Sequence, residues 1–227
     1  MRRTRLAALA AAALLTLPVA ATTGATVANA DDRSGNNKNN NNKTRVFRAH
    51  LEPLNNSGAS GVAKLRLKGR TLDIRIDAKG LAPNLVHAQH IHGVGNSECP
   101  PMSAAGADGV LSTVDGLPFY GPVVTSLTTS GPTSAAEALT ISLMPVADAN
   151  GEIRYRRTLT LPANVAANLG AFQIVQHGID PNKNGMYDFS LGKSSLNPEF
   201  PLEATAPANC GTIDANGRGH AGKAHRH

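Results

Sequence analysis

Short segments with the side-chain pattern of β-strands dominate this chain from residue 46 to residue 177. Each segment alternates apolar and polar residues or is rich in β-branched residues, and each is bounded by Gly, Pro, Asn or Asp, as is typical of strands separated by turns. The segments are 46–51, 62–67, 72–76, 85–92, 123–127, 139–146, 153–161 and 172–177. An Ala-rich stretch at 162–169 predicts one or two turns of helix instead. The pattern therefore predicts an all-β fold, an antiparallel Greek-key β-sandwich or barrel.

The N-terminus has the order of a secretory signal peptide. Arginines at positions 2, 3 and 5 precede an apolar run from 6 to 21, and Ala-Asn-Ala at 28–30 follows. This run is shorter than the roughly 20 residues that span a bilayer, so we expect a secreted protein with no stable membrane anchor after cleavage. We expect residues 1–30 to be the signal peptide, 31–43 a disordered Asn-rich leader, 44–213 a β-sandwich domain and 214–227 a flexible His-containing tail.

The charge pattern argues against a nucleic-acid partner. Cleavage after Ala30 removes three of the 22 Lys and Arg residues and none of the 16 Asp and Glu residues, which lowers the formal net charge from +6 to +3. Lys64, Arg66 and Lys68 alternate with apolar residues, as expected on a solvated strand face. No helix-borne basic patch accompanies them. The chain also lacks a phosphate-binding loop and a Gly-x-Ser-x-Gly nucleophile motif.

Histidines provide the strongest candidate for a functional site. In the run His-Ala-Gln-His-Ile-His at 87–92, alternation along a strand puts His90 and His92 on one face and His87 on the other. If a second strand brings His177 across from them, three neutral imidazole nitrogens converge, which is a ligand set that copper or zinc accepts. Paired histidines on an exposed strand with no further ligand are only a weak metal signal, so the pattern alone leaves a metal site and a solvated strand both open.

The remaining histidines carry weaker signals. His50 lies on an early predicted strand and has no partner visible in the sequence. His220, His225 and His227 could capture a metal ion in the tail, but flexible histidines bind metals weakly without preorganisation. We therefore expect the tail histidines to be solvated.

The run at 87–92 resembles the copper half-site of secreted copper-zinc superoxide dismutases, whose motif reads His-x-x-His-x-His. The segment 174–178 is similar to the later strand of that family that supplies another copper histidine. The resemblance implies that His90, His92 and His177 bind copper, and that His87 is a structural histidine facing outward.

The two cysteines follow the same family order. The segment 209–213 resembles the C-terminal segment that closes the family disulfide onto the loop after the copper strand, so Cys210 is expected to pair with Cys99. An even cysteine count in an exported protein also favours one disulfide.

A second resemblance covers more of the chain. From residue 46 to residue 213 the sequence is similar to secreted bacterial chordin-like (CHRD) domain proteins, a sandwich family related to the dismutases, and segments 117–122 and 201–207 belong to the match. It implies a superoxide dismutase-like fold. Most members of this family have no assigned function, so the resemblance implies no particular activity.

Two departures limit what the dismutase resemblance implies. No histidine lies between His92 and His177, so the bridging ligand and the zinc ligands that dismutases place there have no counterpart. Pro207 stands where dismutases have an arginine that attracts superoxide. The resemblance therefore implies a copper site without a zinc site, and it argues against an efficient dismutase.

One loop has oxygen donors at a spacing typical of calcium loops. Asp180, Asn182, Asn184 and Asp188 alternate around Gly185, but a leucine takes the position of the bidentate glutamate of an EF-hand. Asn and Asp beside Gly also form ordinary turns. The sequence predicts a weak calcium site here, with a plain turn as the alternative.

Three functions fit these observations. The first is a non-enzymatic extracellular metal-binding or interaction protein with a three-histidine copper site and an extracellular partner that the sequence does not identify. The second is a divergent copper-only superoxide dismutase. The third is a structural or adhesion module without metal.

Overall fold

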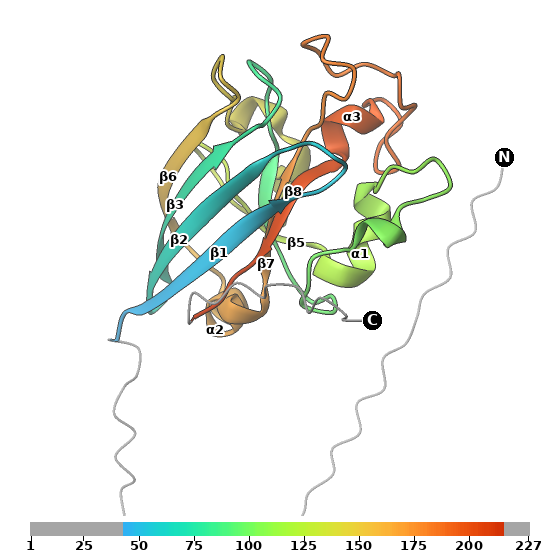
Figure 1. The fold of residues 1–227 in the computed structure, drawn as a ribbon. Coiled ribbons are helices and arrows are strands. Elements are labelled where there is room, and N and C mark those ends of the chain that lie inside the picture. Colours follow the sequence, from blue (N-terminus) through green and yellow to red (C-terminus); the bar gives the residue numbers. More distant parts are fainter. Residues whose placement is uncertain (1–42, 216–227) are drawn as a thin grey trace, which may run out of the picture. The chain divides into compact units, whose positions relative to one another are not determined.

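The computed structural model describes residues 43–215 (Figure 1). The predicted signal peptide, the predicted leader up to residue 42 and the tail from residue 216, with its three histidines, lie outside the described residues. Within residues 43–215, no helix has both the length and the apolar character needed to cross a bilayer.

Eight antiparallel strands form a sheet with the order β5-β4-β7-β8-β1-β2-β3-β6. The strands are β1 (Arg45–Pro53), β2 (Ser60–Lys68), β3 (Thr71–Lys79), β4 (Gln89–His92), β5 (Val123–Ser126), β6 (Ile153–Thr160), β7 (Gln173–His177) and β8 (Pro207–Thr212). Several neighbours, such as β3 and β6 or β4 and β7, are not consecutive in the chain, so connections cross the ends of the sheet as in Greek-key folds. The predicted all-β, antiparallel fold is confirmed.

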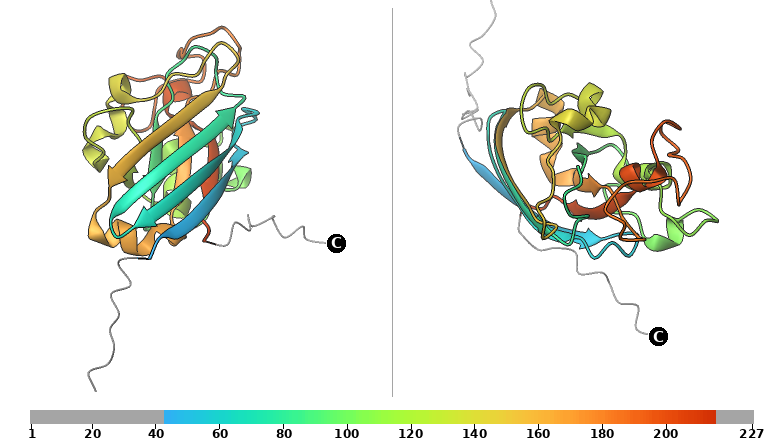
Figure 2. Two further views of the ribbon diagram at one scale, coloured as in Figure 1. Left: turned by 90° about the vertical axis from the view of Figure 1, so that its left-hand side faces the viewer. Right: turned by 90° about the horizontal axis from the view of Figure 1, so that it is seen from above.

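The sheet curls around the hydrophobic core. Figure 2 shows β1, β2, β3 and β6 as one curved layer, with β7 and β8 facing it. Because side chains alternate along each strand, one face of every long strand is apolar and points inward. Leu65 and Ile74 lie opposite each other on β2 and β3 and are fully buried. Ile91 of β4 and Ile174 of β7 belong to the same core, so the strand that carries His90 and His92 is anchored through its apolar face.

Side chains connect the two edge strands of the curled sheet, β5 and β6. Tyr155 and Arg157 of β6 donate hydrogen bonds to the carbonyl oxygen of Thr128, at 3.1 and 2.8 Å. Thr128 follows the end of β5 at Ser126 by two residues. These hydrogen bonds hold the open side of the half-barrel together.

Short helices cover the ends of the sheet. They are α1 (Thr113–Tyr120), α2 (Ala163–Asn168) and α3 (Leu202–Thr205), with 3-10 helices η2 (Met102–Ala104), η3 (Ala135–Leu139), η4 (Ile141–Leu143) and η5 (Leu169–Ala171). Helix α2 confirms the helix predicted at 162–169. Helix α1 was not predicted, although Ser112 and Asp115 form a capping box at its start, which is a helix signal that the sequence contains.

The strand predicted at 139–146 is wrong. Leu139 ends η3, and Ile141–Leu143 forms η4. Backbone N–H groups here bind carbonyl oxygens three residues back: that of Thr140 binds Glu137, and that of Leu143 binds Thr140. The Ser134 hydroxyl accepts a hydrogen bond from the Ala136 N–H and starts the first of these turns. The apolar residues of this segment therefore lie mainly in 3-10 turns rather than in a strand.

One strand start differs clearly from the prediction, and one strand was not predicted. β4 begins at Gln89 rather than at residue 85, and only Val86 of the earlier part makes an isolated bridge, to Val146. β8 was not among the predicted strands, because its sequence, Pro-Ala-Asn-Cys-Gly-Thr, has few residues that favour strands. It is nevertheless central, paired with β1 and β7.

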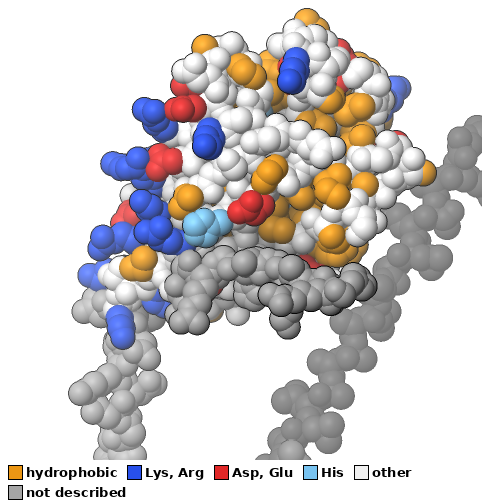
Figure 3. Space-filling view, viewed as in Figure 1, with side chains coloured by type: hydrophobic (Ala, Val, Ile, Leu, Met, Phe, Trp, Pro, Cys, Tyr) orange, Lys and Arg blue, Asp and Glu red, His pale blue; other side chains and the backbone are white. Residues whose placement is uncertain are grey.

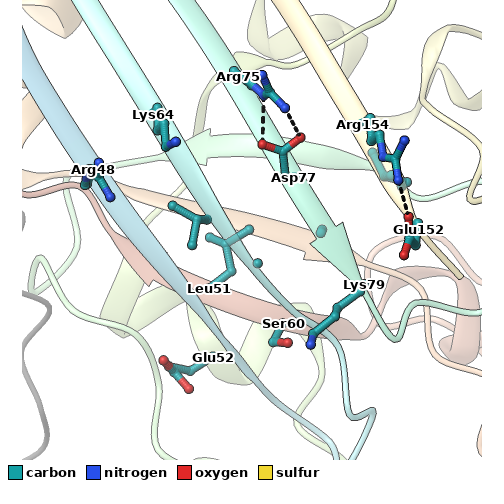
Figure 4. A pocket seen from close by; sticks show the side chains of 14 residues that line it. Arg48, Leu51, Glu52, Ser60, Lys64, Arg75, Asp77, Lys79, Glu152 and Arg154 are labelled. Atoms are coloured by element: carbon teal, nitrogen blue, oxygen red, sulfur yellow. Dashed lines mark hydrogen bonds and ion pairs between the residues drawn. The ribbon is translucent and has the colours of Figure 1, made fainter.

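Basic side chains lie on the outer face of β1, β2, β3 and β6 (Figure 3). Arg48, Lys64, Arg75 and Arg156 are consecutive cross-strand partners and form one row across these four strands. Figure 4 shows part of this row, with Arg75 bound to Asp77 at 2.7 Å. Lys64, Arg66 and Lys68 are exposed, as predicted for a solvated strand face.

Candidate metal centre

The pairing of β4 with β7 brings three histidines to one face of the sheet. His90 pairs with Val175, and Gln89 pairs with Gln176. His177 is the last residue of β7 and lies opposite Ala88, which shares a strand face with His90 and His92; its N–H donates to the carbonyl oxygen of Ala88 at 2.8 Å. Residues directly opposite in an antiparallel pair share a face, so His177 projects from the same side of the sheet as His90 and His92.

The three imidazole rings lie next to one another. Ring centroids are 5.6 Å apart for His90 and His92, 5.2 Å for His90 and His177, and 5.7 Å for His92 and His177. All three side chains are buried. One ring nitrogen from each lies within 4.8 Å of the others, which is close enough for one metal ion to contact all three.

One nitrogen of each ring binds a backbone carbonyl oxygen. Nε2 of His90 donates to Ala138 at 3.0 Å, Nδ1 of His92 donates to Gly121 at 2.8 Å, and Nδ1 of His177 donates to Thr205 at 2.8 Å. A carbonyl oxygen only accepts, so each of these nitrogens carries the proton. The partner oxygen therefore sets the tautomer and the orientation of each ring, as carbonyl partners do for metal-bound histidines.

The opposite nitrogens carry the lone pairs that can bind a metal. They are Nδ1 of His90, Nε2 of His92 and Nε2 of His177, and each is buried without a hydrogen-bond partner. A buried polar atom without a partner is costly, and such atoms call for an explanation. These three nitrogens belong to the three rings whose possible ligand atoms lie within 4.8 Å of one another. Three neutral imidazole nitrogens form a donor set that fits copper or zinc.

Burial keeps all three histidines neutral at ordinary pH. It lowers the pKa of His92 to about 3, with the nearby His177 adding to the effect. It lowers the pKa of His177 to about 4. The pKa of His90 is held well below its usual value, first by burial and then by His177 and His92. Since protons compete with metals for imidazole, these low pKa values leave the ligands ready to bind.

Aromatic packing and a glycine fix the position of His92. Its ring lies edge-on to the ring of Tyr120, with the two ring centroids 4.5 Å apart. Gly121, whose carbonyl oxygen binds His92, ends helix α1 with a φ of 75°, and a Cβ atom there would lie 2.0 Å from the carbonyl oxygen of Gly93. The backbone conformation that positions His92 therefore requires glycine at residue 121.

The other predicted histidines lie elsewhere. His87 is completely buried rather than outward-facing, and its two ring nitrogens lie 2.9 and 3.0 Å from the carbonyl oxygens of His177 and Ala82. These contacts fit the structural role predicted for it, and they tie the end of β7 to the segment before β4. His50 is exposed on β1.

The predicted calcium loop is exposed, and its side chains bind one another. Asp180 accepts hydrogen bonds from the N–H groups of Asn184 and Gly185, at 3.2 and 2.9 Å. The side-chain amides of Asn182 and Asn184 donate to Asp188 at 3.2 and 2.6 Å. This network is that of a stable turn, and calcium binding here stays a prediction.

Cys99 and Cys210 form a disulfide bond, with their Cα atoms 5.8 Å apart. Cys99 lies in the loop after β4, and Cys210 lies on β8. The predicted pairing is confirmed. The bond attaches the loop that follows His92 to the strand beside β7.

Sequence reasoning missed the carbonyl groups that orient the rings. Ala138, Gly121 and Thr205 are 28 to 48 residues from the histidines they bind. Every residue has a backbone carbonyl group, so the residue type does not indicate which carbonyl binds a histidine. Of the three, Gly121 and Thr205 lie in two segments of the family resemblance, 117–122 and 201–207. The candidate site therefore consists of three histidines and of three backbone carbonyl groups that are distant in sequence.

Comparisons with known proteins give a limited result. No family model matches the chain, and no curated protein matches it. Among solved structures, the chain is similar to superoxide dismutase 5 of Candida albicans. The copper(II) structure of that protein is 16% identical with a TM-score of 0.40, covering 80% of this chain and 99% of the other. Two mutant structures give the same identity and TM-score, with 81% of this chain and 99% or 97% of the other covered. The cluster of His90, His92 and His177 is observed in this structure itself.

Proposed function

We propose that this protein is an extracellular copper-binding protein whose single metal centre consists of His90, His92 and His177. The observation that carries the proposal is a cluster of three buried histidines whose possible ligand atoms lie within 4.8 Å of one another. One nitrogen of each ring is bound to a carbonyl oxygen, and the other has no hydrogen-bond partner. When bound, copper would supply a redox-active Lewis acid at this position. The residues of the chain hold it, fix the tautomers and shield it from bulk water.

The role we propose is binding rather than catalysis. An efficient superoxide dismutase attracts an anion, and charge-guided encounter raises association rates by about 10-fold to 1,000-fold. Among residues 43–215, no Asp, Glu, Lys or Arg lines the cavity over the three histidines. Pro207, at the position where dismutases have a guiding arginine, is buried in β8. These observations make a copper-only dismutase the weaker alternative.

Metal titration of single-site variants tests the proposal. We expect the metal-free protein to bind one equivalent of Cu(II) in isothermal titration calorimetry. His90→Ala, His92→Ala and His177→Ala should each weaken binding at least tenfold, because two imidazoles compete poorly with buffer for copper. His50→Ala, which removes an exposed histidine on β1, is the matched control and should leave binding unchanged.

Two results would overturn the assignment. Copper affinity that survives His90→Ala together with His92→Ala but disappears on truncation after Gly219 would place the site in the tail. Failure to retain any metal would favour the structural or adhesion role. Turnover of superoxide near the diffusion limit by the copper-loaded protein, slowed by added salt, would instead promote the dismutase alternative.

A further inference from the structure

A cavity of about 320 Å³ lies over the three histidines. His90, His92 and His177 line it together with Ala88, the small residue next to the start of β4. Its other walls come from α1, from the start of β5, from the η3 and η4 segment, and from the chain around α3. The three histidines therefore face a cavity that is partly open to solvent.

The lining of this cavity is almost entirely apolar. Besides the histidines, the polar side chains in the lining are Thr113 and Thr205. The hydroxyl of Thr113 donates to the Thr205 carbonyl oxygen at 2.6 Å, and that of Thr205 donates to Ser194 at 2.8 Å. Both hydroxyl protons are thus already used. The three histidines are the other polar side chains of the lining, and one ring nitrogen of each is buried without a hydrogen-bond partner.

The residues at the mouth are also apolar. Leu139, Ile141 and Leu196 line the cavity, yet they are 40%, 46% and 44% exposed. Leu139 and Ile141 belong to η3 and η4, and Leu196 belongs to the loop before α3. Large apolar side chains gathered at one exposed place indicate a binding surface. These side chains offer no polar partner to a charged group that passes the mouth.

We propose that this cavity binds a small uncharged molecule, mostly apolar, that carries one nitrogen or oxygen lone pair and ligates the metal ion over the three histidines. The inference rests on the proposed copper site. Three protein ligands leave a coordination position for an external donor. The volume equals about ten water molecules, at about 30 Å³ each, which suits a molecule of roughly ten non-hydrogen atoms. Ligand sites commonly combine an apolar wall with a few orienting polar groups.

Two probes that share one donor group test the proposal. Imidazole and 4-phenylimidazole both offer one ring nitrogen to copper, and only the second adds an apolar group. With the copper-loaded protein, dissociation constants are read from the shift of the visible copper absorption and from the electron paramagnetic resonance spectrum. We expect 4-phenylimidazole to bind at least tenfold more tightly than imidazole, which corresponds to about 1.4 kcal/mol. A copper–diethylenetriamine complex serves as reference, and it should bind the two probes within about threefold.

Variants at the mouth separate the cavity from the metal. Ile141→Asp and Leu196→Asp should remove most of the preference for 4-phenylimidazole while copper stoichiometry and imidazole affinity stay within about threefold. Val46→Asp is the matched control, because Val46 is an exposed apolar residue on β1 outside the cavity, and it should keep the preference.

The possible failures are distinguishable. If the copper-loaded protein binds both probes as the reference complex does, the inference is wrong while the copper site stands. The inference is also wrong if the preference survives both aspartate variants. If no copper is retained, the proposed function fails, and this inference fails with it.

Discussion

At the scale of single residues, His90, His92 and His177 each donate a hydrogen bond from one ring nitrogen to a backbone carbonyl oxygen. The other ring nitrogen of each has no hydrogen-bond partner. His90 uses Nε2 for its carbonyl bond, whereas His92 and His177 use Nδ1. The metal would therefore be bound by Nδ1 of His90 and by Nε2 of the other two.

The low pKa values of these histidines predict a pH-dependent stability of the metal-free protein. His92 and His177 bind protons only near pH 3 to 4 when folded, but at about pH 6.5 when unfolded. The unfolded state therefore holds more protons below pH 6.5, and the free energy of unfolding falls as the pH falls toward 4. Each histidine contributes up to about 1.4 kcal/mol per pH unit.

Urea unfolding of the metal-free protein at pH 7.5 and pH 5.0 measures this effect. We expect a loss of roughly 2 to 4 kcal/mol at the lower pH from these two residues. The variant with His92→Gln and His177→Gln should show a clearly smaller loss, and His50→Ala should behave as the wild type. An equal loss in the double variant would show that other groups cause the dependence.

Gly121 gives a second prediction at this scale. Gly121→Ala should destabilise the protein and weaken copper binding, because the new Cβ would collide with the carbonyl oxygen of Gly93 and displace the carbonyl group that holds His92. Gly109→Ala is the matched control: Gly109 has the same φ of 75°, and a Cβ there meets nothing within 4 Å. The control should show only the backbone cost, about 1 kcal/mol.

Thermal unfolding and copper titration of both variants check this prediction. We expect Gly121→Ala to lose at least about 2 kcal/mol more than Gly109→Ala, since overpacking costs typically 1 to 3 kcal/mol. Equal losses, or unchanged copper affinity in Gly121→Ala, would show that the close approach at residue 121 does not position His92.

Part of the site was predictable residue by residue. Alternation along a strand put His90 and His92 on one face without any tertiary information. His177 needed the pairing of β4 with β7, which the chain pattern does not contain, and the family resemblance supplied it. The carbonyl partners at Ala138, Gly121 and Thr205 depend on distant loop conformations, so no sequence pattern predicted them.

At the scale of elements, strand pairing explains both the site and the outer face. The same alternation that buries Leu65 and Ile74 puts Arg48, Lys64, Arg75 and other basic residues outside. Lys64 lies directly between Arg48 and Arg75 in the cross-strand row. Like charges opposite each other destabilise a sheet by a few tenths to about 1 kcal/mol.

This row predicts a stabilising substitution. Lys64→Glu should raise the free energy of unfolding by about 0.5 kcal/mol at low salt, because it replaces repulsion from Arg48 and Arg75 by attraction, a gain reduced by the loss of the favourable interaction of Lys64 with Asp77. The gain should shrink at high salt. Lys68→Glu is the control, because Lys68 pairs with Thr71. Urea unfolding at low and high salt compares them, and an equal gain from both variants would attribute the effect to net charge alone.

The elements also show where pattern reasoning failed. The predicted ranges of β2 and β3 matched the structure within a few residues. The segment 139–146 did not, because local hydrogen bonds of η3 and η4 satisfied its backbone. Strand β8 was missed because its place between β7 and β1, rather than its residue types, makes it a strand.

At the scale of the whole molecule, the curled sheet and the disulfide hold the metal centre together. The bond between Cys99 and Cys210 joins residues 111 positions apart. In the chain-entropy model, a disulfide that closes a loop of that length stabilises the folded state by up to about 4 to 5 kcal/mol. The bond attaches the loop after β4 to β8, the neighbour of β7, so it supports both strands that carry the three histidines. The chain thus positions a small buried site through contacts that span most of the domain.

A crystal structure of the protein loaded with one equivalent of copper, with anomalous data at the copper edge, tests the central claim most directly. The account predicts one anomalous peak at about 2.0 to 2.1 Å from Nδ1 of His90, Nε2 of His92 and Nε2 of His177. The three carbonyl hydrogen bonds should remain. A peak at the tail histidines or in the loop around Asp180 and Asp188, with none between these three rings, would contradict it.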